Sequence, residues 1–178
     1  MNFEKNEAVQ LLGRTPVTLH ALLSGLGDGW LIANEGEGTW TPSQVIDHLI
    51  ECEKTNWIPR IVSIIDSRGN RDFPPFDRDA HLTYPSSTID QKLSEFTQLR
   101  MQNVERLNTL ISCPEDLERT GIHPAFGEVK LSELLSTWVV HDLTHLSQIV
   151  RVMAERYRED VGPWEAYLGA LKVGRNDV

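Results

Sequence analysis

Apolar residues recur every three or four positions in four long segments, the spacing that places side chains on one face of a helix. The segments cover about residues 3–26, 41–66, 87–111 and 131–157, and Gly, Pro and polar residues separate them. No segment shows the strict alternation of a half-buried strand, and no internal repeat is visible. The pattern predicts an all-α protein, a four-helix bundle with long crossover loops.

Local signals indicate where these helices begin and bend. The string TPSQ at 41–44 has the form of a capping box with Pro at the first helical position, which predicts a helix start. Pro59 should kink or interrupt the same helix, because it has no N–H to donate to the preceding turn. In the first segment, Thr15 followed by Pro16 predicts a restart or a kink.

The connections between the helices are long. Residues 68–87 are irregular and rich in Pro, so we expect a crossover loop, a kind of segment that often serves as a lid or an interface. The glycines at 25–38 follow a helix and not a strand, so they indicate a plain loop and not a phosphate-binding loop. We expect another loop at 121–130 and a short final helix at 164–171.

Size and charge narrow the classes of function. A chain of 178 residues suits a single domain, which we place over residues 1–178. The 26 acidic and 17 basic residues give a formal charge of −9 without a basic cluster, which argues against nucleic acid or an anionic membrane as a partner. Cys52 and Cys113 form no metal-type or redox-type pair. With no signal-peptide pattern and no apolar run of membrane-spanning length, we expect a cytoplasmic protein.

Two histidines occupy the inward face of the last long segment. His141 and His145 are four residues apart, about 40° around the helix and about 6 Å along it, so both imidazoles can bind one metal ion from the same side. His48 lies on the inward face of the second segment. Bundles build metal sites from core positions of facing helices, so these three histidines are candidate ligands of a divalent metal, zinc or nickel.

Another interpretation of the histidines stays open. A buried imidazole without a partner costs roughly 1–3 kcal/mol, so three of them favour a shared metal ion. A core histidine can instead bond to a backbone carbonyl, and a helix also carries two histidines four residues apart by chance.

Four stretches of the chain resemble one known family. They are GRTPVTLHALLSGL at 13–26, WTPSQVIDHLIECE at 40–53, IHPAFGEVKLSELL at 122–135 and HDLTHLSQI at 141–149. In their order and spacing they resemble the DinB-like superfamily of metalloenzymes, which includes YfiT-like proteins and thiol-dependent S-transferases.

The resemblance implies a four-helix bundle with an unusual crossover topology, often as a homodimer. It also implies a metal bound by three histidines, one from the second helix and two from the last. These positions fall on His48, His141 and His145, and none of the three is replaced.

A site with three protein ligands leaves room for water or substrate, which is typical of catalytic metal sites. The expected activity is hydrolysis, or transfer of a small-molecule thiol to an electrophile. The substrate would be a small molecule, with a low-molecular-weight thiol among the candidates. Two alternatives are a non-catalytic metal-binding or stress-response module and a structural dimer without metal.

Residues near the histidines allow further predictions. Cys52 is interpreted as a small buried core residue, with a fourth metal ligand as the alternative. Glu51 should lie on a solvated helix face, although a base near the metal is also conceivable. Asp142 could orient an imidazole or form a salt link between helices. Gln148 should line the pocket.

Other residues carry weaker signals. His123 should be structural, in a turn before the last helix, and His20 and His81 are assigned no role because nothing suggests partners for them. Apolar side chains near the C-terminus either cap the bundle or offer a dimer surface: Trp164, Tyr167, Leu168 and Leu171.

Overall fold

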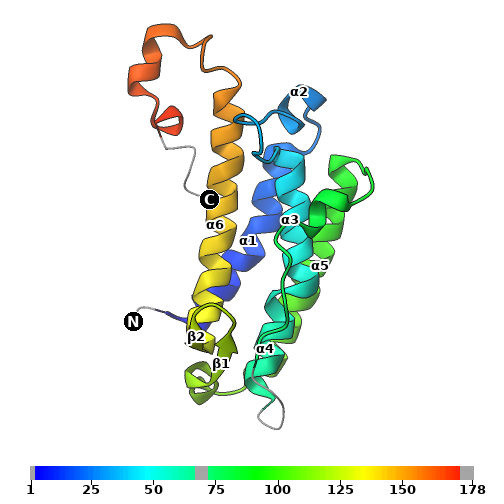
Figure 1. The fold of residues 1–178 in the computed structure, drawn as a ribbon, viewed down its shortest axis with the longest axis vertical. Helices are drawn as coiled ribbons and strands as arrows, with labels where there is room; N and C mark the ends of the chain where they lie inside the picture. The colour runs from blue at the N-terminus through cyan, green and yellow to red at the C-terminus, as the bar shows by residue number, and fades with distance from the viewer. Residues whose placement is uncertain (1–2, 67–71, 173–178) are drawn as a thin grey trace.

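The structure, a computed structural model, describes residues 3–66 and 72–172. α1 (Lys5–Leu23), α5 (Ile89–Leu110) and α6 (Leu131–Glu155) are long helices, and a fourth rod consists of α3 (Pro42–Thr55) followed by α4 (Trp57–Ile65). These rods run side by side along the longest axis (Figure 1). The predicted all-α four-helix bundle is confirmed.

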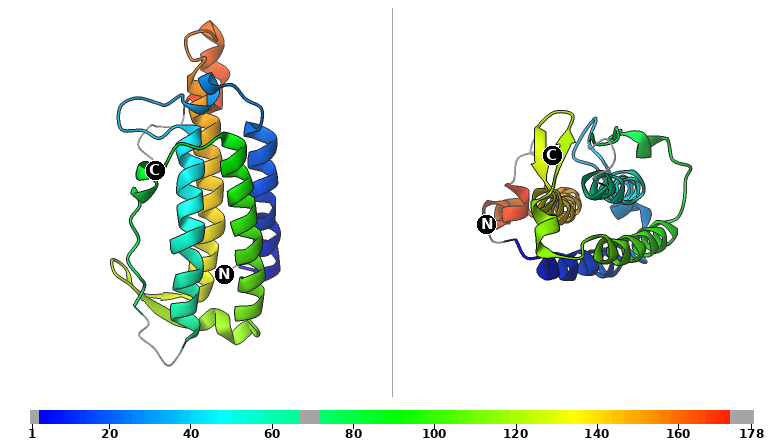
Figure 2. Two further views of the ribbon diagram at one scale, coloured as in Figure 1. Left: turned by 90° about the vertical axis from the view of Figure 1, so that its right-hand side faces the viewer. Right: turned by 90° about the horizontal axis from the view of Figure 1, so that it is seen from below.

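Helices that follow one another in the chain are not always neighbours. α1 packs against α5 and α6, and α3 packs against the same two helices (Figure 2). The connection from α1 to α3, which contains the short helix α2 (Asp28–Leu31), therefore crosses the end of the bundle. This topology makes α3 and α6, which carry the candidate ligands, direct neighbours.

The predicted helix start at 41–44 is confirmed. Thr41 Oγ1 accepts from the backbone N of Gln44 at 3.2 Å, and Gln44 Oε1 accepts from the backbone N of Thr41 at 2.9 Å. The interruption by Pro59 is also confirmed, since α3 ends at Thr55 and α4 begins at Trp57. A proline cannot donate to the carbonyl four residues earlier, which here is that of Thr55.

The first segment does not restart at Pro16. α1 is continuous from Lys5 to Leu23 with Pro16 inside it. Pro16 leaves the carbonyl of Leu12 without its usual helical donor, and Arg100 of α5 supplies one, with Nη1 3.0 Å from that oxygen. A tertiary hydrogen bond thus compensates for the bond that the proline removes.

Residues 121–130, expected to be a loop, form most of a β-hairpin. β1 (Thr120–His123) pairs antiparallel with β2 (Gly127–Lys130), and His123 lies opposite Gly127, which adopts a positive φ of 74°. Each strand has only four residues and is largely accessible, so no alternating pattern was visible in the sequence.

The crossover loop extends across this hairpin. Phe73 N donates to Ile122 O at 2.9 Å, and the loop then forms a 3₁₀ turn, η1 (Ala80–Thr83), before α5. The first part of the predicted loop, 68–71, lies outside the described residues. The short helix expected at 164–171 is wrong in type, since two 3₁₀ turns, η3 (Gly162–Tyr167) and η4 (Gly169–Leu171), occupy this region.

A polar layer divides the core into two apolar clusters. One cluster includes Leu12, Trp57, Leu107, Leu135 and Trp138. The other includes Leu19, Ile46, Leu49, Phe96 and Ile149. Where the clusters meet, each rod contributes a buried polar side chain: Thr15, Glu53, Arg100 and Asp142. Among the described helices, none is long and apolar enough to cross a membrane.

Candidate metal centre

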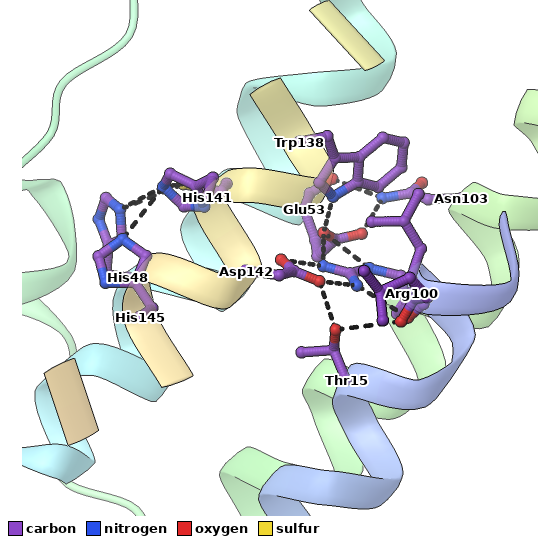
Figure 3. Close-up of polar contacts among 12 residues, drawn as sticks. Thr15, His48, Glu53, Arg100, Asn103, Trp138, His141, Asp142 and His145 are labelled. Carbon is purple, nitrogen blue, oxygen red and sulfur yellow. Dashed lines mark hydrogen bonds and ion pairs between the residues drawn. The ribbon is translucent and has the colours of Figure 1, made fainter. Parts of the chain in front are cut away.

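The three candidate ligands meet beside the polar layer. His48 lies in the second turn of α3, and His141 and His145 lie on successive turns of α6. His141 Nε2 is 3.2 Å from His48 Nε2 and 3.1 Å from His145 Nε2 (Figure 3). Two nitrogens bound to one zinc ion at about 2.0–2.1 Å are separated by roughly 2.8–3.4 Å. The two spacings each fit a pair of ligands on a single ion.

Hydrogen bonds determine which nitrogen of two rings carries the proton. His48 Nδ1 lies 3.3 Å from the carbonyl oxygen of Arg78, and His145 Nδ1 lies 2.8 Å from Gln148 Oε1. Both partners accept hydrogen bonds, so each Nδ1 donates and each Nε2 keeps a lone pair. This is the arrangement that outer partners impose on histidines that bind metal.

The three Nε2 atoms together have too few protons to pair with all of their lone pairs. His141 Nε2 faces the lone pairs of His48 and His145, and it can donate a proton to only one of them. His141 Nδ1 is buried and has no hydrogen-bond partner within residues 3–66 and 72–172. A cation among the three Nε2 atoms would satisfy all the lone pairs at once, so the donor set fits a divalent metal.

The electrostatics keep these imidazoles neutral. Burial, followed by the proximity of His145, lowers the pKa of His48 to about 3 and that of His141 to about 2. Burial also lowers the pKa of His145, although its hydrogen bond to Gln148 opposes the shift. Neutral imidazole is the form that binds metal.

Cys52 lies beside the rings of His48 and His141. Its Sγ is 3.5 Å from His48 Nε2 and 3.9 Å from His141 Nε2, and the residue is 0% exposed. It is buried, as predicted, but its Sγ and the ring nitrogens of His48 and His141 all lie within 4.8 Å of one another, so the alternative of a further metal ligand also fits the geometry. Burial, and then the charge of Glu53, raise the pKa of the thiol, so these surroundings favour the protonated form.

Two acidic neighbours have roles outside the cluster. Glu51 was expected on a solvated face, but it is 8% exposed because Tyr84 from the crossover loop covers it and donates its hydroxyl to Glu51. The carboxylate of Asp142 accepts from Arg100 and from the hydroxyl of Thr15, the latter at 2.6 Å. The salt-link interpretation of Asp142 is therefore correct.

Arg100 connects the two helices that carry the candidate ligands. Its Nη2 is 2.8 Å from Glu53 Oε1 on α3 and 2.9 Å from Asp142 Oδ1 on α6, and the residue is 1% exposed (Figure 3). Burial disfavours its charge, but Glu53 and Asp142 outweigh burial and raise the pKa of Arg100. Sequence analysis missed this residue, although a lone arginine four positions after Phe96 on an apolar stripe was a usable signal.

Three further residues differ in part from expectation. His81, predicted to have no partners, has its ring 5.2 Å from that of His48 and is bonded through Nδ1 to the carbonyl of Arg78 at 3.1 Å. Gln148 is buried and orients His145, and it does not line the cavity. His123 has the predicted structural role, because its Nδ1 accepts from two backbone N–H groups of the hairpin turn. It also reaches the cavity.

A cavity of about 950 Å³ opens onto the cluster. His48, His141 and His145 all line it. The remaining wall comes from α4, the crossover loop, the hairpin and α6, and includes Trp57, Phe73, Phe76, Val129, Leu134 and Val140. A small molecule in this largely apolar space would contact the ring nitrogens directly.

Comparison with known proteins agrees with this architecture. A protein of Bacillus cereus (strain 03BB102) is 26% identical over 113 residues, which cover 63% of this chain and 64% of that protein. A protein of Bacillus mycoides (strain KBAB4) is 27% identical over 114 residues, with the same coverage. Both carry the name "putative metal-dependent hydrolase". The match thus spans less than two thirds of each relative.

A solved structure shares the fold. YfiT from Bacillus subtilis, described as "a probable metal-dependent hydrolase with an unusual four-helix bundle topology", matches with a TM-score of 0.71 and 21% identity. The match covers 88% of this chain and 87% of that one. The family model of the DinB superfamily matches residues 11–149, a range that contains all three histidines. The chain therefore belongs to the DinB superfamily.

Proposed function

We propose that the protein is a metal-dependent hydrolase that acts on a small electrophile. His48, His141 and His145 would bind one divalent metal ion, zinc or nickel. The observation that carries the proposal is the convergence of three Nε2 atoms at the wall of a cavity, two of them held as lone-pair donors by outer hydrogen bonds. The names of the Bacillus relatives support the same activity.

The chain itself would supply the ligands, their orientation and an apolar reaction space. Three protein ligands would leave room on the metal for water or substrate, and all three histidines line the cavity. A divalent metal there would provide Lewis-acid activation of water and of the substrate's electrophilic centre. Arg78 and Gln148 keep two rings in the binding tautomer through their oxygen atoms.

The size of the cavity favours one further candidate. At about 950 Å³ it lies at the upper end of ordinary ligand pockets, so it has room for a second reactant. A low-molecular-weight thiol could occupy that room and be transferred to the electrophile. Both reactions require the same three histidines, and their products distinguish them.

The first test is bound metal, measured by elemental mass spectrometry on protein purified without an affinity tag or a chelator. We expect about one zinc or nickel ion per chain in the wild type and almost none in His145→Ala. His20→Ala, which removes an exposed histidine of α1, should keep the wild-type content. Equal metal in the wild type and His145→Ala would refute the ligand assignment.

Activity is then assayed on the metal-loaded protein with 4-nitrophenyl acetate, with and without added small thiols. Hydrolysis that disappears in His145→Ala and persists in His20→Ala would support the hydrolase. Thiol consumption with formation of a thioester or thioether would support transfer instead. A loaded protein inactive in both assays would favour the non-catalytic metal-binding module.

A further inference from the structure

The start of α4, with the preceding residue Asn56, presents an unusual set of unpaired polar atoms. Asn56, Trp57 and Arg60 all line the cavity that contains the histidines. Asn56 Oδ1, Trp57 Nε1 and Arg60 Nε are buried, and none of them has a hydrogen-bond partner among the described residues. Buried polar atoms are nearly always paired, so three such atoms on one cavity wall indicate a place for water or a ligand.

The helix break explains why these atoms gather here. Pro59 interrupts the rod after Thr55, so α4 begins a new turn beside the cavity. The Trp57 ring lies 5.1 Å from that of His141. The Arg60 guanidinium lies 5.2 Å from the Phe73 ring, over an aromatic wall supplied by the crossover loop.

The charges around the cavity contrast with those of the whole chain. The chain carries a formal charge of −9, yet two arginines, Arg60 and Arg78, line this cavity. Neither forms an ion pair with a carboxylate in the part of the chain that the structure describes. Among the described residues that line the cavity, Glu133 carries the single carboxylate, and it accepts from the backbone N of Lys130. Burial lowers the pKa of Arg60, as expected for a cation without a counter-charge.

We propose that Arg60 and Arg78 bind an anionic oxygen group of the substrate, a carboxylate or a phosphate. The Trp57 indole N–H would donate to the same group, and the apolar part of the substrate would pack against Phe73 and Phe76. Guanidinium groups stacked on aromatic rings suit planar, two-point recognition of such oxyanions. This inference rests on the proposed function, because it makes the cavity beside the histidines the substrate site.

The geometry also limits the size of the substrate. The Phe76 ring adjoins both centres, with its centroid 6.2 Å from the ring of His48 and 5.9 Å from the guanidinium of Arg60. The anionic group would therefore lie about one aromatic ring away from the histidine cluster. Small acids with a reactive bond a few atoms from the acid group fit this spacing.

Isothermal titration calorimetry on the 178-residue protein as purified tests the inference without requiring turnover. The probes are 4-phenylbutyrate and its neutral amide, with phenyl phosphate as a second anion. We expect both anions to bind about tenfold or more tightly than the amide, since hydrogen bonds to charged groups are the stronger ones. The ratio between the two anions identifies the preferred oxygen group.

Arginine variants then show which residues bind the anions. Arg60→Gln and Arg78→Gln should each lower the affinity for the anions about tenfold and leave the affinity for the amide unchanged. The control is Arg106→Gln, which removes the same charge from an exposed position of α5 and should bind both probes like the wild type. Arg60→Lys should recover part of the affinity, because it restores the charge without the planar fork. Circular dichroism checks that each variant is folded.

The outcomes separate this inference from the proposed function. Equal affinity for acid and amide, or unchanged anion affinity in both glutamine variants, would overturn the anion site even if the protein hydrolyses esters. Unchanged affinity in both variants would mean that the carboxylate binds elsewhere, for example directly to the metal. Arginine-dependent anion binding in a protein that hydrolyses no ester would leave the anion site standing and reject the hydrolase.

Discussion

At the scale of single residues, the protonation of three imidazoles governs what the cluster can bind. His48 and His145 are oriented by oxygen acceptors that are not themselves candidate ligands, one from the crossover loop and one from the next turn of α6. Burial then keeps the rings neutral. The same burial makes the metal-free protein sensitive to acid.

We expect the free energy of unfolding of the metal-free protein to fall as the pH falls below about 6.5. In the unfolded chain these imidazoles take up protons near that pH, whereas in the folded chain the pKa of His48 is about 3 and that of His141 is about 2. Protons therefore favour the unfolded state throughout this interval. Urea denaturation at several pH values between about 7.5 and 5.5 measures the slope.

A variant separates the contribution of the imidazoles from that of the other titrating groups. His48→Gln removes one of the buried titrating rings, so its stability should depend less steeply on pH over the same range. With metal bound, acid should instead release the ion, because protons and metal compete for the same lone pairs. Identical slopes in the wild type and His48→Gln would contradict the predicted role of burial.

At the scale of elements, a buried arginine sets the spacing of the helices that carry the histidines. Arg100 of α5 lies between Glu53 of α3 and Asp142 of α6, and Asp142 directly follows His141. Trp138 also donates from Nε1 to Glu53 at 3.2 Å. This network fixes α3 against α6 one layer away from the histidine cluster (Figure 3).

Arg100→Met should lower the free energy of unfolding by about 3–5 kcal/mol, because it leaves two buried carboxylates without their cation. It should also weaken metal binding, since the ligand-bearing helices lose their common partner. Arg100→Lys keeps the charge, so its free energy of unfolding and its metal affinity should fall less. Denaturant unfolding and competition with a metal chelator measure the two effects.

The control for this prediction is Arg106→Met, which changes an exposed arginine on the same helix. Its free energy of unfolding should stay within about 0.5 kcal/mol of that of the wild type. If Arg100→Met were as stable as Arg106→Met, the network would contribute no net stability, as happens for some buried ion pairs that apolar residues can replace.

At the scale of the whole molecule, the C-terminal segment leaves apolar side chains in solvent. Trp164 is 69% exposed, Tyr167 is 85% exposed and Leu168 is 39% exposed, whereas Leu171 is 7% exposed and packs inward. The segment projects beyond one end of the bundle before it turns back along α6 (Figure 1). Only Leu171 behaves as a cap, and the aromatic side chains remain available as a contact surface.

We expect a homodimer in which the exposed aromatic side chains of this segment are buried. Replacing Trp164 and Tyr167 together by Ser should shift the protein toward monomer without reducing its metal content. Met101→Ser, which removes a 67% exposed apolar side chain from α5, is the control and should stay dimeric. Sedimentation velocity over a range of concentrations distinguishes the species, and a monomeric wild type would refute the prediction.

Much of the fold could be predicted because the signals are local. The capping box at 41–44 and the break at Pro59 depend only on backbone hydrogen bonds within a few residues. The stripe that holds His141 and His145 depends only on the helical repeat. The hairpin escaped prediction because its strands are stabilised by pairing with each other and with the crossover loop.

The sequence by itself determined the helices, their inward faces and the three histidines as candidate ligands, since periodicity places side chains on a face without reference to distant partners. Only the tertiary structure decided what those faces meet. It brought His81 against His48, Arg100 between two carboxylates, and Arg60 to the cavity wall. Each of these contacts joins residues far apart in the chain, so it depends on which helices become neighbours and not on any local pattern.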